Sequence, residues 1–160
     1  GYERMLGSEG REDALILSIQ LMIVLILGLA SIHAAEAETN MVLLLNSVPG
    51  KQDSRRAKGV LAPMYAVTAA VFTFAPHITA IVKNYGLSGL FACGHSVPLL
   101  RMGTQTVLAG LCIYAAIAIS LAILTAHLVS WISEKSGSIV STVVMSSTLL
   151  LIPAAVYLIL

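Results

Sequence analysis

Four long runs of apolar residues, separated by polar segments, dominate the pattern of the chain. Within these runs no Asp, Glu, Lys or Arg occurs, and they extend over residues 14–35, 60–82, 106–132 and 139–160. A helix needs about 20 apolar residues to cross the hydrocarbon core of a bilayer. Because lipid offers no hydrogen-bond partner to an open strand edge, each run is predicted to be a transmembrane helix. The sequence therefore predicts an all-α polytopic membrane protein with about four transmembrane helices.

Local signals refine these helices. Glu12 and Asp13 precede the first run and suit a helix N-terminus. Pro63 falls in the first turn of the second run, whereas Pro76 lies deep enough to kink that helix or end it early. Pro153 predicts a kink in the fourth helix.

The polar segments complete the domain organisation. The last two helices should form an antiparallel hairpin, because only a short turn joins them. The segments are an N-terminal tail (1–13), a polar segment (36–59), a loop (83–105) and a turn (133–138).

The distribution of basic residues predicts the orientation. The polar segment and the turn carry five Lys and Arg residues, and the tail and the loop carry four. Four of the five lie together in the polar segment next to a span, where the positive-inside rule acts most strongly. We therefore expect residues 36–59 in the cytoplasm and both ends of the chain outside.

Composition agrees with a membrane protein. Of 160 residues, 58% are hydrophobic and 11% charged, and the mean hydropathy is +0.91. The net charge of +1 gives no electrostatic reason to expect a nucleic-acid partner. The chain begins without Met and stops inside an apolar run, so we expect it to be a piece of a longer protein.

Small residues recur at four-residue intervals in the second and third runs. Such stripes let helix backbones approach closely, which predicts helix packing, although a stripe can also line a pathway. The candidate packing residues are Ala62, Ala66, Ala70, Gly110, Ala118, Ala122 and Ala126.

Motifs for enzymatic chemistry are absent from the sequence. We find no H-E-x-x-H, G-x-S-x-G, C-x-x-C or phosphate-binding G-x-x-x-x-G-K-[ST] pattern. His77 and His127 have no second ligand at metal-binding spacing, and Cys93 and Cys112 are interpreted as separate thiols. We therefore expect no catalytic residue, cofactor or metal in this chain.

The polar segment has the most specific pattern. Glu36 and Glu38 open an amphipathic stretch that places Met41, Leu44, Leu45 and Val48 on one helical face, before Pro49 and Gly50 break it. A short basic helix, residues 52–58, should then lead into the second span. Together the two helices are predicted to lie along the inner membrane surface.

This segment resembles a known pattern, M-x-x-L-L-x-S-x-x-G-[R/K]-x-x-x-x-x-A-K, between two apolar helices. It is similar to the coupling segment of type-two export permeases of bacterial ATP-binding-cassette (ABC) transporters. Asn40, Lys51 and Ser54 depart from the commoner Gly, Arg and apolar residue. The matching positions are Glu36, Met41, Leu44, Leu45, Ser47, Gly50, Lys51, Ala57 and Lys58.

The resemblance implies a mechanism. The segment would dock on a cytoplasmic ABC ATPase subunit, which would hold ATP and Mg, and a second permease half would complete the transporter in the bacterial inner membrane. Glu36 and Glu38 would fix the coupling helix and the turn from Pro49 to Lys51 would contact the ATPase. The face formed by Met41, Leu44 and Leu45 would pack on the membrane domain.

An alternative interpretation is a four-helix scaffold or accessory protein. It would bind another membrane protein through the small-residue stripes, and its basic segment would only anchor to anionic lipid.

Overall fold

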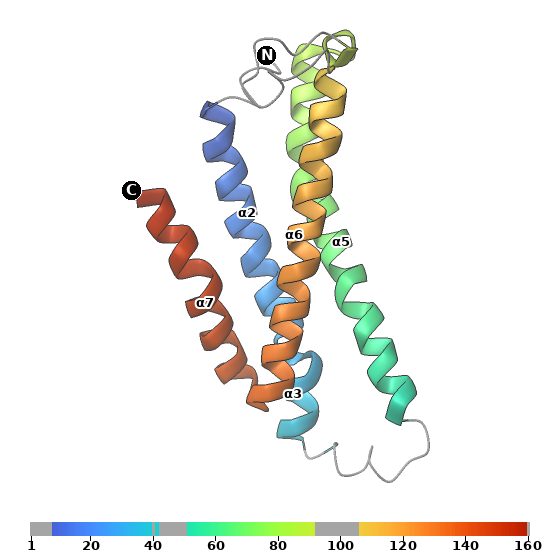
Figure 1. Cartoon of the computed structure of the whole chain (residues 1–160), viewed down its shortest axis with the longest axis vertical. Coiled ribbons are helices and arrows are strands. Elements are labelled where there is room, and N and C mark those ends of the chain that lie inside the picture. The colour runs from blue at the N-terminus through green and yellow to red at the C-terminus, as the bar shows by residue number, and fades with distance from the viewer. Residues whose placement is uncertain (1–7, 40, 42–50, 92–105, 160) are drawn as a thin grey trace.

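The computed structural model describes residues 8–39, 41, 51–91 and 106–159 of the chain, and these residues form an elongated helical bundle (Figure 1). No strand occurs in these ranges, which confirms the prediction of an all-α polytopic fold. The helices are α2 (Ser8–Leu29), α3 (Ser31–Glu38), α5 (Lys51–Tyr85), α6 (Val107–Ser136) and α7 (Ile139–Ile159), and the short 3-10 helix η1 covers Ser88–Phe91.

Four stretches of these helices are long and apolar enough to cross a membrane. They are Glu12–Glu38, Arg56–Asn84, Val107–Ser136 and Ile139–Val156. Each overlaps one of the runs found in the sequence. The chain is therefore a multi-pass membrane protein.

The first run contains two helices instead of one. α2 ends at Leu29 and α3 begins at Ser31, although Ala30 between them keeps helical backbone angles. The polar contacts described below explain this interruption.

The second run belongs to a longer helix than the sequence predicts. α5 begins at Lys51, so the basic residues 52–58 continue directly into the span without forming a separate helix. Pro76 does not end the helix, which reaches Tyr85. A proline removes one backbone hydrogen bond, and in lipid the neighbouring residues gain most by keeping the remaining ladder intact.

α6 and α7 run antiparallel and are joined at Gly137 (Figure 1). Gly137 has a φ of 63°, a left-handed conformation that glycine adopts at low cost and that ends helices. At the other end of α6, the side chain of Thr106 accepts a hydrogen bond from the N–H of Ala109 at 3.4 Å.

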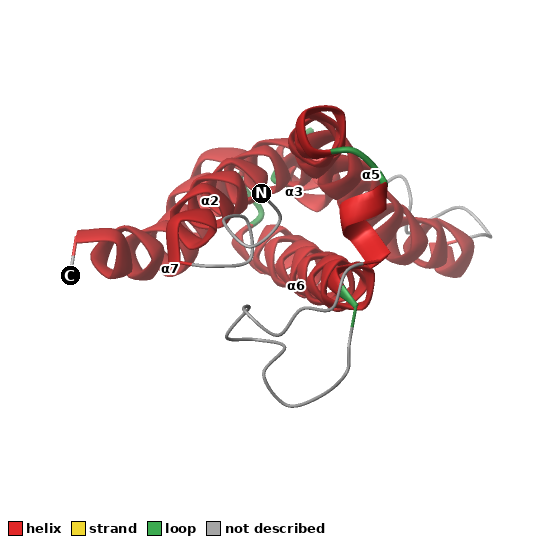
Figure 2. Cartoon of the chain, turned by 90° about the horizontal axis from the view of Figure 1, so that it is seen from above, coloured by secondary structure: helices red, strands yellow, loops and turns green. Residues whose placement is uncertain are grey.

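The core lies where α2, α5 and α6 meet. α2 contributes large aliphatic side chains and α5 contributes mainly alanine, so the two helices can approach closely. α7 packs near the turn and diverges from the bundle toward its C-terminal end (Figures 1 and 2). The buried core residues are Leu21, Leu25, Ile26, Leu29, Ala62, Ala66, Ala69, Ala70, Phe74, Ala122, Ala126 and Val129.

Candidate functional site

The candidate site is the end of the bundle that carries α3, the beginning of α5 and the turn between α6 and α7, which we call the coupling end (Figure 1). All three elements lie on one side of the apolar spans. The described parts of the polar segment and the α6–α7 turn therefore share one side of the apolar spans, as the alternation of four spans requires.

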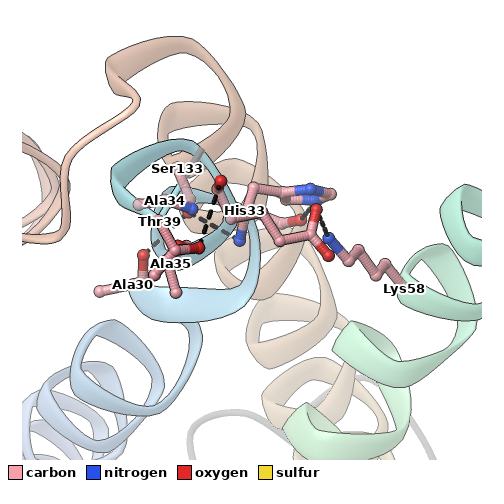
Figure 3. A network of polar contacts seen from close by, with 9 residues as sticks. Ala30, His33, Ala34, Ala35, Thr39, Lys58 and Ser133 are labelled. Atoms are coloured by element: carbon pink, nitrogen blue, oxygen red, sulfur yellow. Dashed lines mark hydrogen bonds and ion pairs between the residues drawn. The ribbon is translucent and has the colours of Figure 1, made fainter. Parts of the chain in front are cut away.

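A serine from α6 interrupts the first span. The Ser133 hydroxyl donates to the carbonyl of Ala30 at 2.8 Å and accepts from the N–H of Ala34 at 3.1 Å (Figure 3). In an unbroken helix this N–H and this carbonyl would bond each other. The side chain is inserted into the helical ladder, which is a recognised cause of a break between helices.

His33 adds a second contact between the same two elements. Its backbone N–H also points to the Ser133 hydroxyl, at 3.2 Å (Figure 3). Its Nε2 lies 3.2 Å from the hydroxyl of Ser130. Ser133 is fully buried. Because α3 is held by several hydrogen bonds to one face of α6, it should follow α6 when that helix moves.

An ion pair joins α3 to α5. The Nζ of Lys58 contacts Oε2 of Glu36, and the two side chains are 17% and 29% exposed. Partial burial reduces the screening of this pair by water compared with a fully exposed pair. Glu36 and Lys58, which belong to one polar segment of the sequence, are thus brought together from two helices.

The second acidic residue of α3 contacts the fourth span. Oε1 of Glu38 accepts a hydrogen bond from the N–H of Ile139 at 2.8 Å. Ile139 is the first residue of α7, so the carboxylate stands at a helix N-terminus, where negative charge is favourable. α3 is therefore connected by polar contacts to α5, α6 and α7.

The rest of the predicted coupling segment is only partly described. α3 ends at Thr39, whose hydroxyl donates to the carbonyl of Ala35 at 2.7 Å. Met41 is 53% exposed. Leu44, Leu45, Pro49 and Gly50 lie outside the described residues, and of Lys51 the structure describes only its place as the first residue of α5.

The small-residue stripes lie mostly inside the bundle. Ala62, Ala66 and Ala70 of α5 are buried against the core, as are Ala122 and Ala126 of α6. Gly110 is also buried, and Ala118 is half-buried against the same core.

The role of Ser133 was not predicted from the sequence, in which this residue falls in the turn after the third span. A serine in the last turn of a helix usually signals only the helix end. Its partners lie about 100 residues earlier in the chain, so local pattern could not reveal the contact.

Within the described ranges, no group of three or more His, Cys, Asp or Glu side chains is placed to hold a metal ion. Comparisons with protein families, with characterised proteins and with solved structures found no match to this chain. The geometry of the coupling end and the sequence of the polar segment are therefore the basis for a functional proposal.

Proposed function

We propose that this chain is the membrane-spanning part of a bacterial ABC export permease. In this permease, the segment after the first span would bind a cytoplasmic ATPase and transmit its ATP-driven movement to the membrane helices. ATP and Mg would be bound by that partner, and a second permease half would complete the transporter. The chain itself would carry no catalytic residue.

The set of polar contacts made by α3 is the observation that carries this proposal. This short helix leads directly into the segment that resembles a coupling segment, and its side chains and backbone contact α5, α6 and α7. The Ser133 hydroxyl separates it from α2. A push on the segment would therefore reach three spans through α3, and the break at Ala30 would let α3 tilt without moving α2 as a rigid rod.

The burial of the small-residue stripes favours the permease over the scaffold. A scaffold that bound its partner through these stripes would need them on its surface. In this bundle, Ala62, Ala66 and Ala126 are at most 1% exposed and pack within the chain.

The proposal is tested first by partner activity. If a neighbouring reading frame encodes an ABC ATPase, the complete protein expressed with that ATPase should purify as a complex that hydrolyses ATP. Gly50→Glu and Lys51→Glu should lower the transport carried out per ATP hydrolysed while the protein remains inserted. The matched control is Lys83→Glu at the opposite end of α5, where Lys83 is exposed and far from the coupling end.

A topology measurement tests the same proposal independently. In a variant without Cys93 and Cys112, a single cysteine is placed at Thr39 or at Lys83, both exposed. An impermeant maleimide should label Lys83→Cys in intact cells and Thr39→Cys only after the cells are opened. Labelling of Thr39→Cys from outside would show that no cytoplasmic ATPase can reach the segment, and would refute the proposal.

A further inference from the structure

A groove between α2 and α5 opens sideways from the bundle and is separate from the coupling end. Its volume is about 740 Å³, within the range of sites that bind small molecules. We call it the lateral groove, and its lining residues are Leu17, Gln20, Val24, Tyr65, Thr68, Ala69, Phe72, Thr73, Pro76 and His77.

The polar end of the lateral groove lies within the hydrocarbon region. Gln20 follows the start of the first candidate span at Glu12, and His77 precedes the end of the second at Asn84. At 1.5 Å per residue, each lies on the order of 10 Å inside the apolar stretch. These residues are therefore accessible to molecules dissolved in the membrane.

Three polar groups in the lateral groove lack a hydrogen-bond partner within the described part of the chain. They are the amide of Gln20, the hydroxyl of Tyr65 and the imidazole of His77. Polar groups without partners are costly in hydrocarbon and often mark functional sites. On α5, Tyr65 lies 12 residues from His77, about 18 Å along the helix, so the two residues line opposite ends of the groove. A single polar head at the His77 end could therefore satisfy Gln20 and His77 together.

The two threonines of the lateral groove differ from these groups. The hydroxyl of Thr68 donates to the carbonyl of Met64 at 2.8 Å, and that of Thr73 donates to the carbonyl of Ala69 at 2.8 Å. Their protons are used within α5, so they offer an occupant only acceptor oxygens. The unsatisfied donors are concentrated on Gln20, Tyr65 and His77.

The rest of the lining defines the chemistry of the occupant. Leu17, Val24 and Phe72 provide apolar walls, and no Asp, Glu, Lys or Arg lines the groove. A charged group would enter hydrocarbon without a counter-ion, at a large cost. A molecule with an uncharged head that carries hydroxyl or amide groups, and with an apolar tail, fits both the polar residues and the apolar walls of the groove.

We propose that the lateral groove binds an uncharged amphipathic molecule drawn from the membrane. Gln20 and His77 hydrogen-bond its head at one end of the groove, and its tail lies against the apolar walls toward Tyr65, which lines the opposite end. The inference that such a molecule is the transported substrate rests on the proposed function. Its binding in the lateral groove does not depend on that function. A second copy of the chain and an ordinary phospholipid tail are the competing occupants.

Photolabelling of the purified chain in phosphatidylcholine nanodiscs tests this site. The probe is a monoacylglycerol whose tail carries a diazirine and an alkyne, and labelled peptides are mapped by mass spectrometry. Two control probes carry the same tail. A hydrocarbon shows how strongly a molecule without a polar head labels the groove, and an alkyl sulfate shows how strongly an anionic molecule labels it. The monoacylglycerol should label the lateral groove at least about fivefold more than either, the effect of one net hydrogen bond.

Variants of the polar residues sharpen the result. Gln20→Leu and His77→Leu should each reduce monoacylglycerol labelling about fivefold and leave hydrocarbon labelling unchanged, since leucine keeps the helices apolar. The matched control is Thr79→Val on α5, where the hydroxyl of Thr79 bonds the carbonyl of Ala75 and does not line the groove. The control should keep full labelling.

Three outcomes would overturn the proposal. They are equal labelling by all three probes, undiminished monoacylglycerol labelling in Gln20→Leu, and crosslinks between copies that compete with the probe. The experiment contains no ATPase. Labelling can therefore succeed where the ATPase test fails, and the two proposals are judged separately.

Discussion

The phenol ring of Tyr65 on α5 lies directly against the backbone of Gly28 on α2. A Cβ atom placed on Gly28 would stand 2.1 Å from the Tyr65 hydroxyl oxygen and 2.4 Å from the ring carbon that bears it. Real side chains do not approach so closely, so the contact depends on glycine. The two spans therefore approach each other through a ring packed on bare backbone.

Replacing Gly28 should separate these helices. Gly28→Leu places a branched side chain where the Tyr65 ring lies, and overpacking of this kind costs about 1–3 kcal/mol of unfolding free energy. The measurement is the unfolding free energy in mixed detergent micelles. Gly59→Leu is the matched control, because nothing lies within 4 Å of a Cβ at that position.

A double variant distinguishes the ring contact from a general effect of leucine in α2. Tyr65→Ala removes the ring, so Gly28→Leu should cost much less in that background than in the natural chain. If Gly28→Leu lowers the unfolding free energy equally in both backgrounds, the loss of stability does not come from the contact with the Tyr65 ring.

Ser133→Ala should weaken the attachment of α3 to α6. The variant removes the hydroxyl that bonds the carbonyl of Ala30 and the N–H of Ala34, and the expected loss is about 1–3 kcal/mol. Ser120→Ala is the control, because the hydroxyl of the exposed Ser120 bonds the carbonyl of Ala116 in its own helix.

Amide hydrogen exchange gives a local signal of the same change. Exchange at Ala34 should accelerate in Ser133→Ala and stay unchanged in Ser120→Ala. If the helical ladder simply closes across Ala30, exchange would slow, and the importance of Ser133 would have to be rejected.

The ion pair between Glu36 and Lys58 should be measurable as a coupling energy. Pairs near a protein surface contribute about 0–1 kcal/mol, and partial burial places this one toward the upper end. The experiment is a double-mutant cycle with Glu36→Gln and Lys58→Met, followed by unfolding free energy at low and high salt. A coupling of zero at both salt concentrations would mean that the pair does not hold α3 to α5.

Glu38 should stabilise the first turn of α7. Its carboxylate bonds the N–H of Ile139, and a negative charge at a helix N-terminus contributes about 0.3–1 kcal/mol. Glu38→Gln keeps an acceptor oxygen and loses the charge, and Glu38→Ala loses both. Hydrogen exchange at residues 139–142 should therefore rise in the order natural chain, Gln variant, Ala variant, and an unchanged rate in the Ala variant would contradict the assignment.

Several features of the fold followed from sequence alone. The four spans, the all-α class and the close approach made possible by Ala62, Ala66 and Ala70 depend on the length, hydropathy and residue size of local stretches. The turn at Gly137 is equally local, because only its own backbone angles and short length matter. Lipid excludes open strand edges, and apolar runs of this length are typical of spanning helices, so local composition was sufficient to determine these elements.

Contacts between distant parts of the chain required the tertiary structure. The interruption at Ala30 comes from Ser133, and the partner of Glu38 is the N–H of Ile139, each about 100 residues away. Gln20 and His77 border one groove only because α2 and α5 pack side by side. Such contacts depend on how the helices rotate and pack against one another, and this is decided by side-chain packing over the whole bundle. The local pattern of apolar and polar residues therefore does not predict them.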